Sequence, residues 1–227
     1  MIDKSEIILQ ELREAGLPKL RIRNKDESWF WRMLPSAWRT CSVTTIGSTI
    51  WVPSATWLRY ASPVRLACTM AHEARHAEDW GFRFLAAYLA PQAFLLAAVV
   101  TIWAIVGGLF PLSTSIHLCL GAGLLCSLAP WPSPWRRRAE LRGYVTGAGV
   151  EIELTGKLSK ATTDAIEAAL TGPVYWWMVW DKDRARGMAD ALRDVVTTMH
   201  EDVAGANPLR SDRLVRAAVR GASRMVE

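Results

Sequence analysis

The sequence lacks the marks of several protein classes. Its four cysteines, Cys41, Cys68, Cys119 and Cys126, form no Cys-x-x-Cys pair. This excludes a zinc ribbon or a disulfide scaffold and favours a reducing compartment. The net charge of +5 over 227 residues is too small to indicate a nucleic-acid partner, and the 51% share of hydrophobic residues excludes intrinsic disorder. We expect one compact core.

Charge is missing from one long stretch. Residues 84–135 contain no Asp, Glu, Lys or Arg. The segments 84–109 and 112–130 each meet the requirement of about 20 apolar residues for a helix that crosses a bilayer. Arginines flank the pair on both sides, and the N-terminus lacks an apolar signal-peptide region. The sequence therefore predicts a membrane protein with two spans and with both hydrophilic parts in the cytoplasm. A hairpin buried within a soluble oligomer is the alternative.

The remaining sequence predicts helices and one strand pair. Residues 3–15 are amphipathic and end at Gly16, whereas 42–52 are β-branched around Gly47-Ser48. Ser62-Pro63 is a helix start, and this helix should run to about Trp80. The later helices are expected at 136–150, 159–171, 183–200 and 211–225. The fold class is mainly α with a small β-hairpin or sheet (α+β).

One motif on the expected helix from Ser62 carries chemistry. His72-Glu73-Ala74-Arg75-His76 matches the His-Glu-x-x-His pattern. Residues four apart share a helix face, so His72 and His76 can offer two imidazoles to one Zn²⁺. Glu73 then stands beside the metal as the general base that accepts a proton from the attacking water. The alternative is an exposed histidine pair with no metal.

A catalytic zinc needs a third protein ligand and one open position. Glu140 is the preferred candidate, because it lies on the helix expected directly after the uncharged stretch. A carboxylate paired with Arg136 or Arg137 is the alternative for this residue. The other acidic or histidine side chains considered are Glu78, Asp79, His117, Glu151, Glu153 and His200.

The order of these features resembles a known family. His72-Glu73-x-x-His76, two apolar segments and then Arg137-x-x-Glu140 are similar to the membrane-embedded gluzincins, typified by the CAAX prenyl endopeptidase and HtpX, or to a minigluzincin. The resemblance covers about residues 40–150. It departs from the family pattern Glu-x-x-Ala-Asp at Gly143-Tyr144.

The resemblance implies His72, His76 and Glu140 as zinc ligands and Glu73 as the catalytic base. It implies a zincin-like core in which 1–83 and 132–227 are two halves, interrupted by a transmembrane hairpin at 84–131. The expected function is a membrane-associated zinc endopeptidase, with a peptide or protein substrate and the lipid bilayer as partners. The alternative is a non-catalytic structural or assembly protein with a vestigial or structural zinc site.

Several secondary features have more than one interpretation. Tyr144, Arg142, Tyr175 and His200 are possible groups for stabilising an oxyanion or contacting substrate, and nothing in their spacing selects one. The strand region 42–52 can accept an extended substrate or serve only as structure. The aromatic run 173–180 suits a substrate cleft, a membrane interface or a core. Arg213, Arg216, Arg220 and Arg224 form a basic stripe that suits anionic headgroups or solvent.

Overall fold

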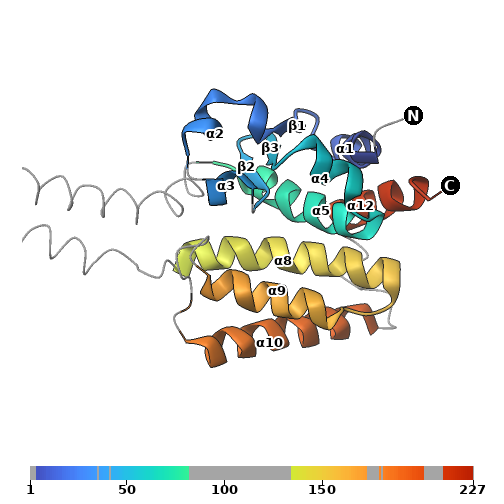
Figure 1. The fold of residues 1–227 in the computed structure, drawn as a ribbon. Coiled ribbons are helices and arrows are strands. Elements are labelled where there is room, and N and C mark those ends of the chain that lie inside the picture. The colour runs from blue at the N-terminus through green and yellow to red at the C-terminus, as the bar shows by residue number, and fades with distance from the viewer. Residues whose placement is uncertain are drawn as a thin grey trace, which may run out of the picture.

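The computed structural model describes residues 4–34, 36–40, 42–81, 134–172, 179, 181–201 and 212–226. The fold is mainly helical, with one small mixed sheet (Figure 1). In chain order its elements are α1 (Lys4–Glu14), β1 (Arg21–Asn24), the 3₁₀ turn η1 (Lys25–Glu27), α2 (Trp29–Met33), α3 (Ser36–Thr40), β2 (Thr44–Ile46), β3 (Thr49–Val52), α4 (Ala55–Tyr60), α5 (Pro63–Asp79), α8 (Pro134–Thr155), α9 (Lys160–Thr171), α10 (Lys182–Glu201) and α12 (Arg213–Arg224).

The sheet has the strand order β1-β3-β2. β2 and β3 are antiparallel, with Thr45 opposite Ile50, and Gly47 turns between them at a φ of 63°. This positive φ favours glycine. The antiparallel pairing of β2 with β3 confirms the predicted strand pair in 42–52. β1 pairs in parallel with β3 and was not predicted, because its four residues, Arg-Ile-Arg-Asn, are too few and too polar to indicate a strand.

A buried lysine fixes the approach to β2. The Lys25 side chain is fully buried, and its Nζ donates to the Ser42 carbonyl at 2.8 Å and to Thr44 Oγ1 at 2.9 Å. The same ammonium lies 4.3 Å from the centre of the Trp31 ring. A buried ammonium is stable only where its donors are satisfied, so these contacts hold the first residue of β2 against η1.

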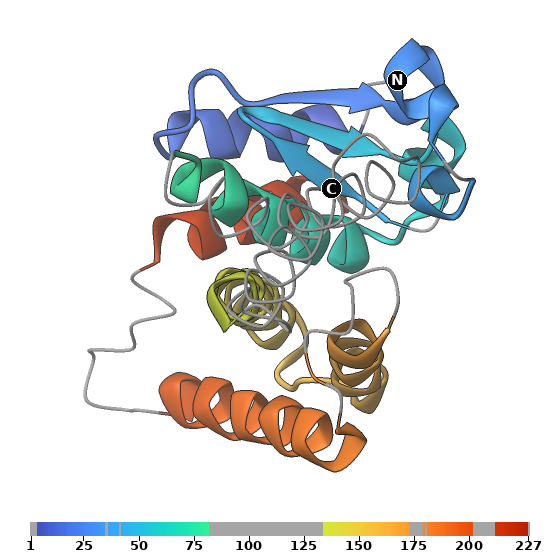
Figure 2. The ribbon, with the colours of Figure 1, turned by 90° about the vertical axis from the view of Figure 1, so that its left-hand side faces the viewer.

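The first hydrophobic core joins the two ends of the chain. Ile8 and Leu12 of α1 pack with Leu214 and Ala218 of α12 and with the small-residue face of α5. The sheet covers one side of this helical layer, and α8 lies on the other side, with α9 and α10 beyond it (Figure 2). Segments more than 200 residues apart in the sequence therefore form one core.

The basic stripe on α12 has partners inside the fold. Arg213 pairs with Glu78 of α5, and Arg220 and Arg224 both pair with the buried Glu11 of α1. Asp212 caps the helix by accepting from Leu214 N at 2.9 Å. Three of the four arginines thus help to attach α12 to α1 and α5.

A second core lies between α8, α9 and α10. Its buried side chains are Ala148, Ile152, Ile166, Leu170, Val179, Ala185, Ala189, Leu192 and Val196. Ser159 begins α9 by accepting from Thr162 N at 3.2 Å. α8 contributes to both cores, with Val150 in the first and Ile152 in the second. It is therefore the central helix of the described fold.

Most predicted helices are confirmed, with shifted ends. α1 ends before Gly16, whose φ is 110°, and α5 begins at Pro63 as predicted. α8 extends further at both ends than the predicted 136–150. α9, α10 and α12 match their predicted ranges to within two residues. The short helices α2, α3 and α4 were not predicted.

The membrane prediction needs correction. No helix in the described ranges combines the length and the apolar composition needed to cross a bilayer. The longest there are α8, with 22 residues, and α10, with 20, and their charged residues, seven and eight, would lose hydration in lipid. This finding contradicts the prediction of a two-span membrane protein facing the cytoplasm. The segments 84–109 and 112–130, assigned to the hairpin 84–131, lie outside the described residues.

Candidate metal centre

α5 carries the two histidines of the motif. Ser62 accepts a hydrogen bond from Arg65 N at 3.2 Å, and Pro63 occupies the first turn, so the helix begins where the sequence indicates. His72 and His76 are four residues apart and therefore lie on the same face. Both are buried, with 8% and 5% of their surface exposed. This face of α5 packs against α8.

α8 runs antiparallel to α5 and brings Glu140 to this pair. Glu140 lies against His76 and His72, Gly143 against His72, and Gly147 against the backbone of Cys68. The contacted residues of α5 thus come in reverse order as the residue number rises along α8. The carboxylate therefore reaches the histidines across a separation of 64 residues, as the third-ligand prediction requires.

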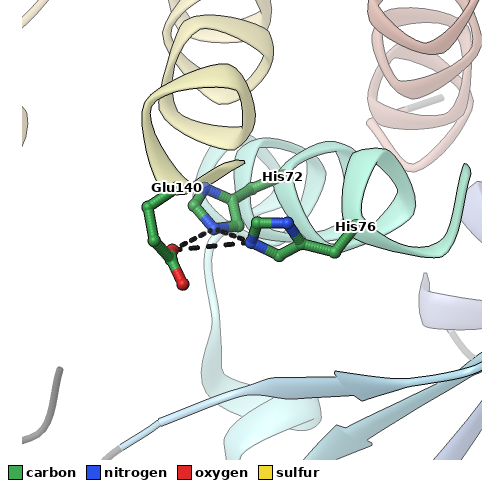
Figure 3. A group of neighbouring side chains, drawn as sticks. All are labelled: His72, His76 and Glu140. Atoms are coloured by element: carbon green, nitrogen blue, oxygen red, sulfur yellow. Dashed lines mark hydrogen bonds and ion pairs between the residues drawn. The ribbon is translucent and has the colours of Figure 1, made fainter. Parts of the chain in front are cut away.

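The three side chains converge on a common point (Figure 3). The two Nε2 atoms are 3.0 Å apart. Glu140 Oε2 lies 3.4 Å from His72 Nε2 and 3.5 Å from His76 Nε2. Ligand atoms at about 2.0–2.1 Å from a tetrahedral zinc are separated by about 3.3–3.4 Å. The triangle therefore has the size that one small cation needs, and these three residues could hold a metal ion.

The electrostatics of the triangle favour positive charge. Burial acts to lower the pKa of His76, but the Glu140 carboxylate outweighs it, together with Glu73 and Asp79, and the pKa is raised. Burial acts to raise the pKa of Glu140, yet His76 and His72 hold that pKa well below its ordinary value. Both pKa shifts have the same cause. The Glu140 carboxylate is fully buried, and its charged form is stable there only with a positive charge beside it.

Glu73 is held by the sheet. Its side chain is 5% exposed, and Thr45 of β2 donates from Oγ1 to Glu73 Oε2 at 2.7 Å. The same hydroxyl lies 3.2 Å from the Glu73 carbonyl oxygen. The contact joins residues 28 apart in the chain, so the edge strand fixes the orientation of the motif glutamate.

The other ligand candidates do not join the cluster in the part of the chain that the structure describes. Glu78 pairs with Arg75 and Arg213, and Asp79 pairs with Arg142. Glu151 accepts a hydrogen bond from Ser159 N at 3.2 Å, and Glu153 is not among the three clustered residues. His117 and the side chain of His200 lie outside the described residues.

Two of the possible oxyanion groups can be located. The Tyr144 ring meets the His72 ring edge-on, with centroids 4.7 Å apart. Arg142 forms an ion pair with Asp79 at 3.0 Å and is otherwise well exposed. Tyr144 is thus next to the triangle, whereas Arg142 is paired with Asp79, the last residue of α5. Tyr175 lies outside the described residues, as does the aromatic run 173–180 apart from Val179.

An ion-pair network supports the helix pair. Arg75, inside the motif, donates from Nε to Thr146 Oγ1 of α8 at 3.1 Å and also pairs with Glu78 and with Asp212. One arginine therefore connects α5, α8 and the start of α12. Its guanidinium suits this role because it offers five donors in a fixed plane.

Two residues of the site were missed by the sequence reasoning. Thr45 was counted only as a β-branched strand residue, and no local signal shows which side chain it meets. Gly143 was noted only as a departure from the family pattern. Its position three residues after Glu140 places it near the same face of α8, and this spacing was the available signal.

Comparisons with protein-family models, with curated proteins and with solved structures found no match. The chemistry of the site must be argued from its geometry. A buried set of two imidazoles and one carboxylate, with a second carboxylate on the same helix, is suited to hold a divalent cation next to a proton acceptor.

Proposed function

We propose that this protein is a zinc-dependent hydrolase that cleaves peptide bonds, with Glu73 as its general base. The observation that supports this most is the triangle of His72 Nε2, His76 Nε2 and Glu140 Oε2, with edges of 3.0, 3.4 and 3.5 Å. On this proposal the small sheet and the α5–α8 pair form a zincin-like core.

The donor set favours zinc. Imidazole nitrogens suit zinc, copper, nickel and iron, whereas oxygen-only sites suit magnesium and calcium. Two histidines and one glutamate, with the fourth position left to water, are a ligand set of catalytic zinc sites. A structural zinc site would need a fourth protein ligand, and only three residues cluster in the described ranges. This favours a catalytic centre over the structural alternative.

Zinc held by these residues would supply a Lewis acid that polarises the scissile carbonyl and favours ionisation of the attacking water. The chain supplies the proton transfers. Thr45 holds Glu73 at Oε2, which leaves Oε1 to accept the proton of the attacking water. The same oxygen can then pass that proton to the leaving amine, and peptide hydrolysis is complete.

The sheet provides a place for a peptide substrate. β2 is at one edge of the described sheet, and its central residue Thr45 contacts the proposed base. An extended peptide can add to a free strand edge through main-chain hydrogen bonds. A substrate lying along β2 would pass next to Glu73, and this arrangement favours a peptide over a compact small molecule.

The test uses the full-length protein, its metal content and a fluorogenic peptide library. Wild type should bind about one zinc per chain and cleave peptides. Glu73→Gln should keep the zinc and lose roughly 100- to 10,000-fold in kcat/KM, the usual contribution of a general base. Absence of zinc in wild type, or full activity of Glu73→Gln, would contradict the proposal. Glu153→Gln on α8 is the matched control and should behave as wild type.

A further inference from the structure

The His72 imidazole lies directly against a bare Cα of α8. A Cβ built at Gly143 would stand 2.8 Å from His72 Cε1 and 2.9 Å from both Nδ1 and Nε2. Carbon atoms in ordinary contact are about 3.5–4.0 Å apart. Any side chain at 143 would therefore require the ring to move by about 0.7 Å or more.

The ring has little freedom to move. The His76 ring meets it edge-on with centroids 4.7 Å apart, and the Tyr144 ring does so at the same centroid distance of 4.7 Å. Its Nε2 is held at 3.0 Å from His76 Nε2 and 3.4 Å from Glu140 Oε2. A methyl group at position 143 would consequently displace Nε2 from the triangle.

We propose that Gly143 is a positioning residue of the metal centre, because its missing side chain leaves the space in which the His72 imidazole points Nε2 toward His76 and Glu140. This inference rests on the proposed function, since it concerns the same centre. Ligand groups must be held to within about 0.5 Å for a productive geometry. The displacement that a Cβ would force exceeds this tolerance.

Gly147 provides the internal comparison. It is one turn further along α8, and a Cβ there would meet the carbonyl oxygen of Cys68 at 3.1 Å but only the Cβ of His72, at 3.8 Å. A side chain at 147 would press on the backbone of α5 and leave the imidazole in place. A substitution at Gly147 therefore tests the spacing between α5 and α8, whereas a substitution at Gly143 tests the position of the His72 ring.

The experiment compares three alanine variants of the full-length protein. Gly143→Ala should weaken zinc binding about 10- to 100-fold, as changes around a ligand histidine usually do, and should alter the visible absorption bands of the Co²⁺-loaded protein. Gly147→Ala should lower the melting temperature and keep the wild-type Co²⁺ spectrum. Gly187→Ala, with nothing within 4 Å of its added Cβ, should change neither property.

A second measurement needs no metal. In metal-free protein, Gly143→Ala should lower the melting temperature, and it should have no such effect when His72→Ala has already removed the ring. An equal effect in both backgrounds would overturn the inference, as would wild-type zinc affinity and Co²⁺ spectrum in Gly143→Ala. Failure of the proposed function would look different, because wild type itself would then bind no zinc or Glu73→Gln would keep full activity.

Discussion

Two buried carboxylates in this molecule have similar surroundings and different partners. Glu11 on α1 and Glu140 on α8 are 1% and 2% exposed, and each faces two nitrogen-bearing side chains. Glu11 meets Arg220, at 2.7 Å, and Arg224. Glu140 meets two imidazoles at 3.4 and 3.5 Å. Oε2 of Glu11 accepts a hydrogen bond from Arg220 Nε, and Oε1 forms an ion pair with Arg224, whereas Glu140 belongs to a wider triangle.

The difference lies in the charge of the partners. Arginine stays protonated in proteins, so the Glu11 cluster carries its own cations and attaches α12 to α1. A neutral imidazole offers a lone pair that a metal can use. The pKa values of His76 and Glu140 are both shifted toward their charged forms. The Glu140 cluster could therefore hold a metal ion, whereas the Glu11 cluster carries its own cations and attaches α12 to α1.

The largest expected effect comes from removing the charge of each carboxylate in turn. Glu140→Gln should lower zinc affinity by more than the roughly 10- to 100-fold that a change outside the ligands costs, because one of three protein ligands becomes a poor donor. Glu11→Gln should keep wild-type zinc affinity and lower the free energy of unfolding by about 1–2 kcal/mol, since its arginines are half exposed.

Zinc titration against a chelating dye, together with urea unfolding, measures both quantities on the same preparations. The comparison fails if Glu11→Gln loses zinc as Glu140→Gln does. It also fails if Glu140→Gln binds zinc normally and changes only stability, because the two clusters would then have the same role.

The second largest effect concerns how closely α12 packs against α1. Gly221 on α12 packs against the backbone of α1, where an added Cβ would lie 2.9 Å from the Ile8 Cα. The Ile8 Cα belongs to the helix backbone, so it cannot move away unless α1 and α12 separate. Gly221→Ala should therefore cost about 1–3 kcal/mol of unfolding free energy with no loss of zinc affinity.

Thermal and urea unfolding of Gly221→Ala, compared with Gly187→Ala, measure this cost. Gly187→Ala on the exposed face of α10 should be neutral or stabilising by up to about 1 kcal/mol. Equal stability of the two variants would show that α1 and α12 separate easily, contrary to the close contact between them.

The sequence predicted those parts of the site that depend on local spacing. Ser62-Pro63 marks the start of α5, and the four-residue step from His72 to His76 requires no tertiary information. Glu140 was selected because it lies on the helix expected directly after the uncharged stretch 84–135. Thr45 and Gly143 were missed, since their roles depend on contacts with residues 28 and 71 positions away.

The elements of the fold were likewise predicted where a local signal exists and missed where they depend on distant contacts. Helices with a clear cap or an amphipathic repeat were predicted, whereas β1 was missed because its hydrogen bonds belong to β3, 28 residues later. The prediction of two membrane spans is contradicted by the described helices, none of which has the length and the apolar composition needed to cross a bilayer. That prediction came from the apolar length of 84–109 and 112–130 alone, and these segments lie outside the described residues.

The smallest expected effect concerns Cys68, which lies four residues before His72 on α5. Burial, with a contribution from the nearby Glu151 carboxylate, raises the pKa of the Cys68 thiol to about 12. In the unfolded chain the thiol has its ordinary pKa of 9.0, so between pH 9 and 12 the unfolded state binds fewer protons than the folded state. Stability should therefore fall over this window, by at most about 1.4 kcal/mol per pH unit.

Urea unfolding of wild type and Cys68→Ala between pH 8 and 12 isolates this contribution as the difference between the two profiles. The difference in unfolding free energy between the two proteins should be constant below pH 9 and should become smaller above it. Below pH 9, mass spectrometry should find Cys68 unmodified by iodoacetamide in the folded protein, because the thiolate is the reacting form. Rapid modification at pH 8 would show that α8 leaves this face of α5 open, and the close α5–α8 contact on which the metal centre depends would be lost as well.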